Sequence, residues 1–211
     1  MPAPLPGILL LDLGRVLFDI DFDRCFAHWA ASARDAGRQV DAATLRARFT
    51  ELDAFERHER GELACDAFFT MLCEQLQIEL EADAVRAGWN AIFGPDVAGL
   101  RHRLLRLAEH RALHVLSNTN RTHAAHFRVR YRTRLEPIGV LFTSHELGMR
   151  KPEARIYDHV VRELDTYPQD VLFLDDNAAN LEAAAARGLQ TLHVPGPDHT
   201  CALLDAMLES L

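Results

Sequence analysis

Lysine is almost absent from this chain of 211 residues. Lys151 is the one lysine among 23 basic residues, and all the others are arginines. A lysine side chain ends in a compact ammonium group with three donors, whereas arginine ends in a wide planar fork. A single lysine therefore suits a crowded site in which one cation contacts two oxygens at once. This directs attention to the loop Arg150-Lys151-Pro152-Glu153.

Other absences exclude whole classes of protein. No long basic stretch concentrates the arginines, and the formal net charge is −8, so the chain is not expected to bind nucleic acid or an anionic membrane. The four cysteines form no Cys-x-x-Cys pair and have no histidine at zinc-ligand spacing, which predicts reduced, structural cysteines. The apolar run near the amino terminus ends at Asp12, too early for a signal peptide or a membrane span. We expect a soluble, cytoplasmic protein that is a monomer or a homodimer.

Short runs that are apolar at all positions, or at all but His114, recur along the chain and are followed by polar residues. They occupy residues 8–11, 113–116, 140–142 and 171–174. Helical patterns lie between and after them, at about 96–111, 121–132, 153–164 and 178–187. Strands that alternate with helices predict right-handed crossovers and an α/β fold with a doubly wound parallel sheet. Ligands of such sheets bind at the carboxyl ends of the strands, where the polar residues of this chain fall.

The stretch from about residue 23 to 93 shows helical periodicity and no buried-strand run. Breaks near Gly37-Arg38, Gly61 and Leu80 divide it into four predicted helices. Such an insertion after the first strand either covers the strand ends as a lid or only adds core. We expect a core domain formed by residues 1–20 and 95–211 and a helical cap domain formed by residues 21–94.

Three carboxylates and one ammonium group are expected to meet at one edge of the sheet: Asp12, Asp175, Asp176 and Lys151. Carboxylates that lie so close together cannot all stay ionised without a compensating cation. A hard dication such as Mg²⁺ satisfies this need, and the absence of Cys and His from these loops disfavours zinc. A phosphoryl group then fits between the dication and the ammonium group. The alternative is that the acidic pair only caps the helix that follows it.

Four short motifs, in this order, resemble those of the haloacid dehalogenase superfamily: Asp12-Leu13-Gly14-Arg15-Val16, Ser117-Asn118, Lys151-Pro152 and Asp175-Asp176. Longer stretches, including His58-Glu59-Arg60-Gly61-Glu62, are similar to the bacterial α-D-glucose-1-phosphate phosphatases of that superfamily. The phosphatase domain of soluble epoxide hydrolase is a more distant likeness. The resemblance implies a Rossmann-like core with an inserted helical cap. It also implies a Mg²⁺-dependent phosphoric monoester hydrolase for small phosphate esters, such as sugar phosphates, that works through a phospho-aspartyl intermediate.

The resemblance further implies a role for each matching residue. Asp12 is expected to be the nucleophile and a Mg²⁺ ligand, and Lys151 to bridge the phosphoryl group and Asp12. The other expected metal ligands are the backbone carbonyl of Gly14, Asp176 directly, and Asp175 directly or through water. The expected phosphoryl ligands are Ser117 and Asn118, with Asn180 orienting Lys151 or a metal-bound water.

Two further residues are candidates for binding the substrate. Arg15 replaces the small or neutral residue that is usual at its position, and it either contacts the substrate or points into solvent. His58 falls at a predicted helix break, where it either binds sugar hydroxyls or belongs to a solvated charged turn. The remaining histidines, including His123, are interpreted as surface or helix-face residues.

Gly14 departs from the family pattern, which has a second aspartate there as general acid and base. Losing such a group typically costs about 10²–10⁴-fold in rate. One interpretation is that a nearby acid or base is recruited instead, with four candidates: Asp19, Asp21, His58 and Glu59. A second interpretation, which we favour, is that the leaving group needs little protonation, because the anomeric hydroxyl of a sugar 1-phosphate is more acidic than an ordinary alcohol. A third is that the chain is a weak or inactive relative.

Two other functions stay open at this stage. A haloacid dehalogenase that cleaves C–halogen bonds also lacks the second aspartate, but such enzymes use no metal and lack an acidic pair like Asp175-Asp176. A non-catalytic sugar-phosphate-binding protein would keep the pocket without turnover.

Overall fold

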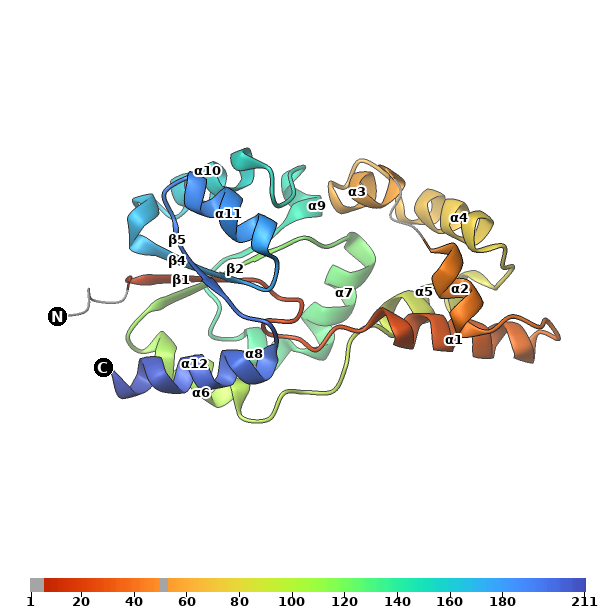
Figure 1. Cartoon of the computed structure of the whole chain (residues 1–211), viewed down its shortest axis with the longest axis horizontal. Coiled ribbons are helices and arrows are strands. Elements are labelled where there is room, and N and C mark those ends of the chain that lie inside the picture. The colour runs from red at the N-terminus through yellow and green to blue at the C-terminus, as the bar shows by residue number, and fades with distance from the viewer. Residues whose placement is uncertain (1–5, 50–52) are drawn as a thin grey trace.

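The structure of the chain is a computed structural model that describes residues 6–49 and 53–211. Within these residues the centre of the fold is a five-stranded parallel sheet with the strand order β3-β2-β1-β4-β5 (Figure 1). The strands are β1 (Ile8–Leu11), β2 (Ala112–Ser117), β3 (Leu141–Thr143), β4 (Val171–Asp175) and β5 (Gln190–His193). The chain runs outward from β1 to β3 and then returns to place β4 on the other side of β1. The predicted doubly wound α/β sheet is confirmed, and its strand order switches between β1 and β4.

Helices cover both faces of the sheet, which explains why β1 is apolar at every position. Leu9 and Leu11 belong to the apolar cluster on one face, while Leu10 belongs to the cluster on the other face. The helices on the first face are α6 (Leu100–Ala108), α7 (Arg121–Arg130), α8 (Arg132–Leu135) and α12 (Pro197–Glu209). Those on the second face are α10 (Ala154–Glu163) and α11 (Ala178–Ala186) (Figure 1).

Two short elements complete the connections, α9 (Ser144–Leu147) after β3 and the 3₁₀ turn Pro168–Asp170 before β4. The four predicted strands and the helices between them are present, with ends shifted by a few residues. The predicted helix at about 121–132 divides into α7 and α8. β5 and α12 were not predicted; β5 lies at the sheet edge, and its sequence Gln-Thr-Leu-His lacks a continuous apolar run.

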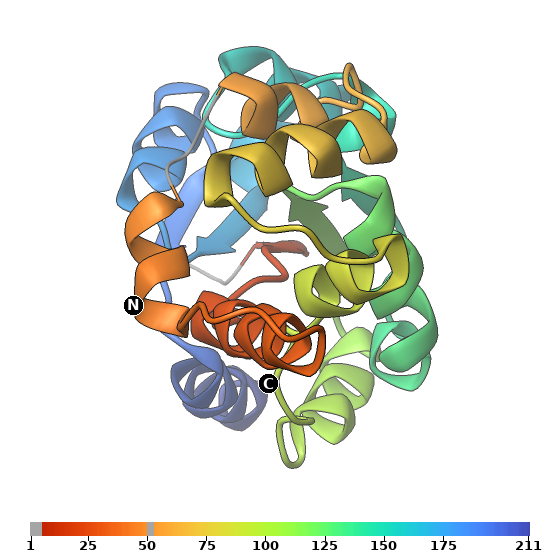
Figure 2. The same cartoon turned by 90° about the vertical axis from the view of Figure 1, so that its right-hand side faces the viewer.

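Five helices lie together at one end of the molecule, beyond the carboxyl ends of the strands (Figures 1 and 2). They are α1 (Phe22–Asp35), α2 (Ala42–Arg48), α3 (Asp53–Glu59), α4 (Cys65–Leu76) and α5 (Ala82–Asn90). We call them the cap helices. Their shared interior is aromatic, with Trp29 stacked on Trp89 at 6.3 Å between ring centroids. The predicted core and cap include residues 1–5 and 50–52, which lie outside the described residues.

The prediction of four helices in the cap was wrong, because a break follows α2 where neither Gly nor Pro marks it. Phe49 ends α2 in an extended conformation. Its ring packs against Phe22 at 5.9 Å and Phe26 at 5.6 Å between centroids. A tertiary contact thus ends the helix, and a local sequence pattern cannot reveal it.

The cap touches the core closely at one turn. Gly61 has a φ of +72°, and a Cβ atom there would lie 2.3 Å from the carbonyl oxygen of His145 in α9. Both the backbone angle and the lack of space require glycine at this position. The break predicted at Gly61 therefore corresponds to a contact between the α3–α4 turn and the core.

No helix among the described residues is long and apolar enough to cross a membrane.

Candidate active site

Three carboxylates converge at the switch in strand order. Asp12 follows β1 directly and Asp175 is the last residue of β4, the strand paired with β1. The backbone N–H of Asp12 donates to the carbonyl of Leu174 at 2.9 Å, which holds the two strand ends together. One carboxylate oxygen from each of Asp12, Asp175 and Asp176 lies within 4.8 Å of the others. Asp12 and Asp175 are buried, and Asp176 is partly exposed.

Lys151 joins two of these carboxylates. Its Nζ donates to Oδ1 of Asp12 at 2.7 Å and to Oδ2 of Asp175 at 2.6 Å, and its side chain is 2% exposed. Burial acts to lower the pKa of Lys151, but Asp12 and Asp175 raise it by more, so that the pKa lies above its ordinary value. The group therefore remains an ammonium ion at neutral pH.

Two asparagines fix Lys151 and its carboxylate partner in place. Asn118 accepts from the backbone N–H of Lys151 at 2.8 Å and donates to its carbonyl at 2.9 Å, which ties the Lys151 loop to the end of β2. Asn180 donates from Nδ2 to both oxygens of Asp175, at 3.0 and 3.1 Å. The backbone N–H of Asn177 adds a third bond to Asp175 at 2.8 Å. Asn180 and Lys151 therefore contact the same carboxylate, that of Asp175.

The charges of the site are not balanced by Lys151 alone. Burial raises the pKa of Asp12 to about 7; Lys151 opposes this increase, and Asp175 and Asp176 add to it. Burial, and next the neighbouring Asp175, also raise the pKa of Asp176. When all three carboxylates are ionised, Lys151 compensates one of them and the exposed Arg15 lies beside Asp176, so negative charge remains uncompensated and a divalent cation would balance it. Every side-chain donor in the cluster is a carboxylate oxygen, so the residues fit a hard cation such as Mg²⁺.

A cavity of about 140 Å³ lies beside this site, between the strand ends and the cap helices; its lining includes the neighbours Leu13 and Gly14 but not Asp12, Lys151, Asp175 or Asp176. Gly14, Ser117 and Asn118 line its core end, whereas Phe22, Phe55 and Glu59 line its cap end. A Cβ atom on Gly14 would lie 3.5 Å from Ile20 Cγ1 and 3.9 Å from Asp12 Oδ2, both ordinary contacts. A Cβ atom would therefore fit at position 14, so crowding at that atom does not explain why glycine replaces the aspartate of the family pattern.

The four candidates for a replacement acid or base lie in different surroundings. Asp19 is held in an ion pair by Arg24, and Asp21 caps α1 by accepting from a backbone N–H. His58 stacks on Phe68 in the interior of the cap, with 4.2 Å between ring centroids. Of these four residues, Glu59 is the one that lines the cavity at Gly14.

The other predicted substrate-binding residues are placed as follows. Ser117 is buried, and its hydroxyl donates to the carbonyl of Asn118 at 3.3 Å. Arg15 has a φ of +58°, in the left-handed region that is uncommon for residues other than glycine. Its Nε lies 3.3 Å from Oδ2 of Asp176, and its side chain is 62% exposed. Arg15 therefore stands beside a predicted metal ligand, and neither it nor His58 lines the cavity at Gly14.

His123 is buried, which corrects its interpretation as a possible surface residue. Its Nε2 lies 3.0 Å from the carbonyl of Trp89 in α5, and its Nδ1 lies 3.1 Å from Nδ2 of Asn120. Burial lowers the pKa of His123 to about 3, and the bond to Trp89 only partly offsets this decrease. The neutral ring donates from Nε2 to the cap and accepts at Nδ1. Its position on a helix face agrees with the sequence, but its contact with the cap was not predicted, although Asn120 three positions earlier is a helix-capping residue.

Stability should fall with decreasing pH because of His123. The unfolded chain binds a proton on this histidine below its ordinary pKa of 6.5, whereas the folded chain does so only near its pKa of about 3. Between these values the free energy of unfolding therefore decreases as the pH falls, by at most about 1.4 kcal/mol per pH unit. Urea unfolding can measure the decrease in the free energy of unfolding between about pH 7 and about pH 5. We expect this decrease to be larger in wild type than in His123→Gln by about 2 kcal/mol. An equal decrease in both proteins would contradict this assignment.

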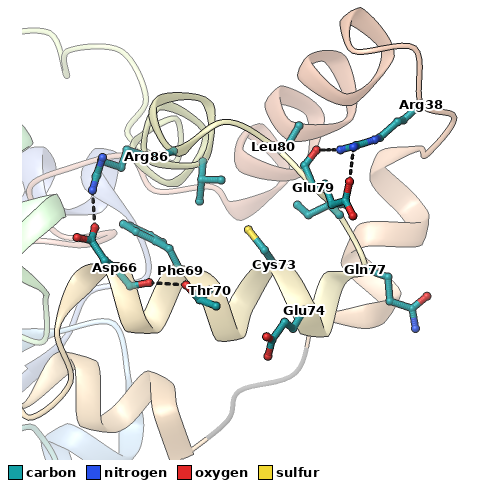
Figure 3. A pocket seen from close by; sticks show the side chains of 13 residues that line it. Arg38, Asp66, Phe69, Thr70, Cys73, Glu74, Gln77, Glu79, Leu80 and Arg86 are labelled. Atoms are coloured by element: carbon teal, nitrogen blue, oxygen red, sulfur yellow. Dashed lines mark hydrogen bonds and ion pairs between the residues drawn. The ribbon is translucent and has the colours of Figure 1, made fainter.

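The largest cavity found among the described residues lies elsewhere, against α4 and α5 of the cap (Figure 3). It encloses about 940 Å³, and ion pairs of Arg38 with Glu79 and of Arg86 with Asp66 cross its walls. All its lining residues belong to the cap region, whereas the cavity at Gly14 is also lined by core residues beside Asp12 and at the end of β2. Size alone therefore does not identify the functional site.

Comparisons with known proteins agree with the fold. D-ribitol-5-phosphate phosphatase of Bacteroides thetaiotaomicron is 27% identical over 190 residues, which cover 87% of this chain and 89% of that protein. A solved haloacid dehalogenase family enzyme from the same organism, in complex with magnesium and inorganic phosphate, superposes with a TM-score of 0.76 at 25% identity, covering 89% of this chain and 93% of that one. Bifunctional epoxide hydrolase 2 of Rattus norvegicus is 43% identical over 54 residues, or 26% of this chain and 10% of that protein.

The fold and the family match together place the chain among the hydrolases. The family model of haloacid dehalogenase-like hydrolases matches residues 24–188. The chain belongs to the haloacid dehalogenase-like hydrolase family, as the resemblance of its four motifs implied.

Proposed function

We propose that this protein is a Mg²⁺-dependent phosphatase for small phosphate monoesters, and in particular for sugar phosphates such as α-D-glucose 1-phosphate. One observation carries the proposal: Lys151 Nζ lies between Asp12 and Asp175 in a cluster of three carboxylates whose negative charge Lys151 alone does not balance. The relative that hydrolyses D-ribitol 5-phosphate and the neighbour bound to magnesium and phosphate support it. We also propose that the cap helices form a separate domain, residues 21–94, above a core of residues 1–20 and 95–211.

In the proposed reaction, a carboxylate oxygen of Asp12 attacks phosphorus and the bond to the ester oxygen breaks, which forms an aspartyl phosphate and releases the ester oxygen as an alkoxide that takes a proton from water to become the alcohol. A water molecule then cleaves the aspartyl phosphate and regenerates Asp12, so that one hard hydrolysis becomes two easier displacements. Lys151 stabilises the negative charge on the phosphoryl oxygens. Ser117 and Asn118 line the same cavity and offer further donors to those oxygens.

Asp12, Asp176, Asp175 and the backbone carbonyl of Gly14 would hold the magnesium ion. When bound, the ion supplies the positive charge that the carboxylates and the phosphoryl group require. Asp175 already accepts hydrogen bonds from Lys151, Asn180 and Asn177, whereas Asp176 has Arg15 beside it. Asp176 is therefore the carboxylate better placed to bind the ion directly.

The basic test is phosphate release from a panel of phosphate esters with and without Mg²⁺. We expect release that depends on Mg²⁺ and stops when EDTA is added. Halide release from 2-haloacids that survives EDTA would instead indicate a dehalogenase. Binding of sugar phosphates without any phosphate release would indicate a binding protein.

The glycine at position 14 predicts a preference for esters with a good leaving group. The anomeric oxygen of α-D-glucose 1-phosphate leaves as a weaker base than the primary alkoxide of glucose 6-phosphate, so it needs less protonation. We expect kcat for the 1-phosphate to exceed that for the 6-phosphate by about 100-fold, within the range of a missing general acid. Equal rates for the two esters would mean that the leaving-group argument is wrong.

Gly14→Asp tests the same argument by restoring an acid. The space around a Cβ atom at position 14 is sufficient, and that atom would lie 3.9 Å from Asp12 Oδ2. The variant should raise turnover of glucose 6-phosphate relative to glucose 1-phosphate by at least about tenfold. Gly14→Asn, with a side chain of the same size and no acid, is the matched control and should leave the ratio of the two rates unchanged.

A further inference from the structure

The cavity at Gly14 is lined mainly by apolar side chains and by one charged group, which is negative. Its sides are formed largely by aliphatic and aromatic side chains, among them Ile20, Phe22, Phe55, Ile92, Phe93 and Phe127. Two ionisable side chains are among the described residues that line it, Glu59 and His123. His123 is neutral, because burial lowers its pKa to about 3. The side-chain charge facing the cavity is therefore the carboxylate of Glu59, which accepts hydrogen bonds and donates none.

Glu59 reaches this position from the end of α3, and the core holds it there. Nε of Arg150 donates to Oε2 of Glu59 at 3.0 Å, and Arg150 directly precedes Lys151. The Glu59 side chain is 9% exposed and that of Arg150 is 17% exposed, so this ion pair is largely shielded from water. Arg150 itself does not line the cavity. The pair therefore fixes the Glu59 carboxylate without placing a positive charge on the cavity wall.

A second glutamate of α3 shares the partner but not the cavity. Oε1 of Glu56 lies 2.9 Å from NH1 of Arg150, and its side chain is 45% exposed. Glu56 is absent from the cavity lining. The helix α3 thus provides two glutamates that contact the same arginine, of which only Glu59 lines the cavity at Gly14.

We propose that Glu59 determines the specificity for the leaving group, an inference that rests on the proposed phosphatase function. Its carboxylate accepts hydrogen bonds from hydroxyls of the leaving group and excludes leaving groups that carry a carboxylate. A hydroxyl of the leaving group can donate to the Glu59 carboxylate, whose two oxygens together accept several hydrogen bonds. A carboxylate of the substrate would instead be placed against a like charge in a shielded site, and such juxtapositions are strongly unfavourable. Arg150 is a positioning residue that acts through Glu59.

The test uses two esters that differ at one carbon atom. α-D-glucose 1-phosphate carries a CH₂OH group where α-D-glucuronic acid 1-phosphate carries a carboxylate, and both release an anomeric oxygen. Wild-type protein should show a kcat/KM for the glucose ester that is about 100-fold higher than for the glucuronic acid ester. Glu59→Gln should reduce this preference by at least about tenfold, because the amide can donate to a carboxylate. Glu56→Gln is the control and should change the preference by less than about threefold.

Binding measured without turnover separates this inference from the proposed function. Calorimetric titration of Asp12→Asn with each ester, in the presence of Mg²⁺, should show the same preference for the glucose ester. If wild type released no phosphate while Asp12→Asn kept that preference, the proposed function would fail and the role of Glu59 would stand. Three results would overturn the role of Glu59: no preference in either assay, a preference unchanged in Glu59→Gln, or an equal loss of preference in Glu56→Gln.

Discussion

Asp12→Asn should abolish phosphate release, with a loss of at least about 10⁴-fold in kcat, while the fold stays intact. An amide has nearly the shape of a carboxylate but does not attack phosphorus. The Oδ1 atom that accepts from Lys151 at 2.7 Å has a counterpart in the amide oxygen. Burial and the neighbouring acids raise the pKa of Asp12 to about 7, which means that a negative charge is costly at this position. A neutral side chain there should therefore leave the melting temperature unchanged or raise it.

The variant is checked by phosphate release and by thermal unfolding of the same preparation. Asp19→Asn is a suitable control, since Asp19 is a partly exposed carboxylate whose partner is Arg24 and which does not line the cavity. Activity of Asp12→Asn within tenfold of wild type would exclude Asp12 as the nucleophile. If the variant lost both its activity and its folded state, the prediction of an intact fold would be wrong, and the loss of activity could not be assigned to the nucleophile.

Lys151→Met should reduce both activity and stability. The side chain is 2% exposed and its ammonium group contacts Asp12 and Asp175, so its removal leaves two buried carboxylates without their cation. Breaking a buried ion pair in this way typically costs about 3–5 kcal/mol. Turnover should fall by about 10³-fold or more, because the phosphoryl oxygens lose their positive partner. Urea unfolding and phosphate release, both without added metal and with Mg²⁺, measure the two effects.

Lys151→Arg separates the charge of this residue from its shape. The guanidinium group keeps a positive charge, so the loss of stability should be smaller than in Lys151→Met. Its wide fork does not fit between two oxygens that lie 2.7 and 2.6 Å from one nitrogen atom, so turnover should still fall. Wild-type turnover in Lys151→Arg would show that the compact shape of lysine is not required, in a chain that uses arginine at every other basic position.

The sheet and the convergence of the acidic residues could be predicted because each depends on local patterns. A strand buried on both faces is apolar at every position, as in Ile8–Leu11, and the ends of neighbouring parallel strands must meet. Asp12 and Asp175 are brought together by this rule alone. β5 escaped prediction since an edge strand has no need of a continuous apolar run, as its sequence Gln-Thr-Leu-His illustrates.

Contacts between the cap and the core could not be predicted, because no local pattern encodes them. His58 and Glu59 are neighbours at the end of α3, yet His58 packs in the cap interior while Glu59 lines the cavity. Which of two adjacent side chains faces the substrate depends on how α3 sits against the core. Arg150, which holds Glu59, and His123, which bonds to the cap through Trp89, were unrecognised for the same reason.

The most direct test of the account is a crystal structure of the protein grown with Mg²⁺ and beryllium fluoride, which adds to a reactive aspartate as a mimic of its phosphoryl adduct. The account predicts beryllium bonded to a carboxylate oxygen of Asp12, fluorine atoms within hydrogen-bonding distance of Lys151 Nζ, and a magnesium ion bound by Asp12 and Asp176. An adduct on another residue, or a magnesium ion bound away from these carboxylates, would contradict it.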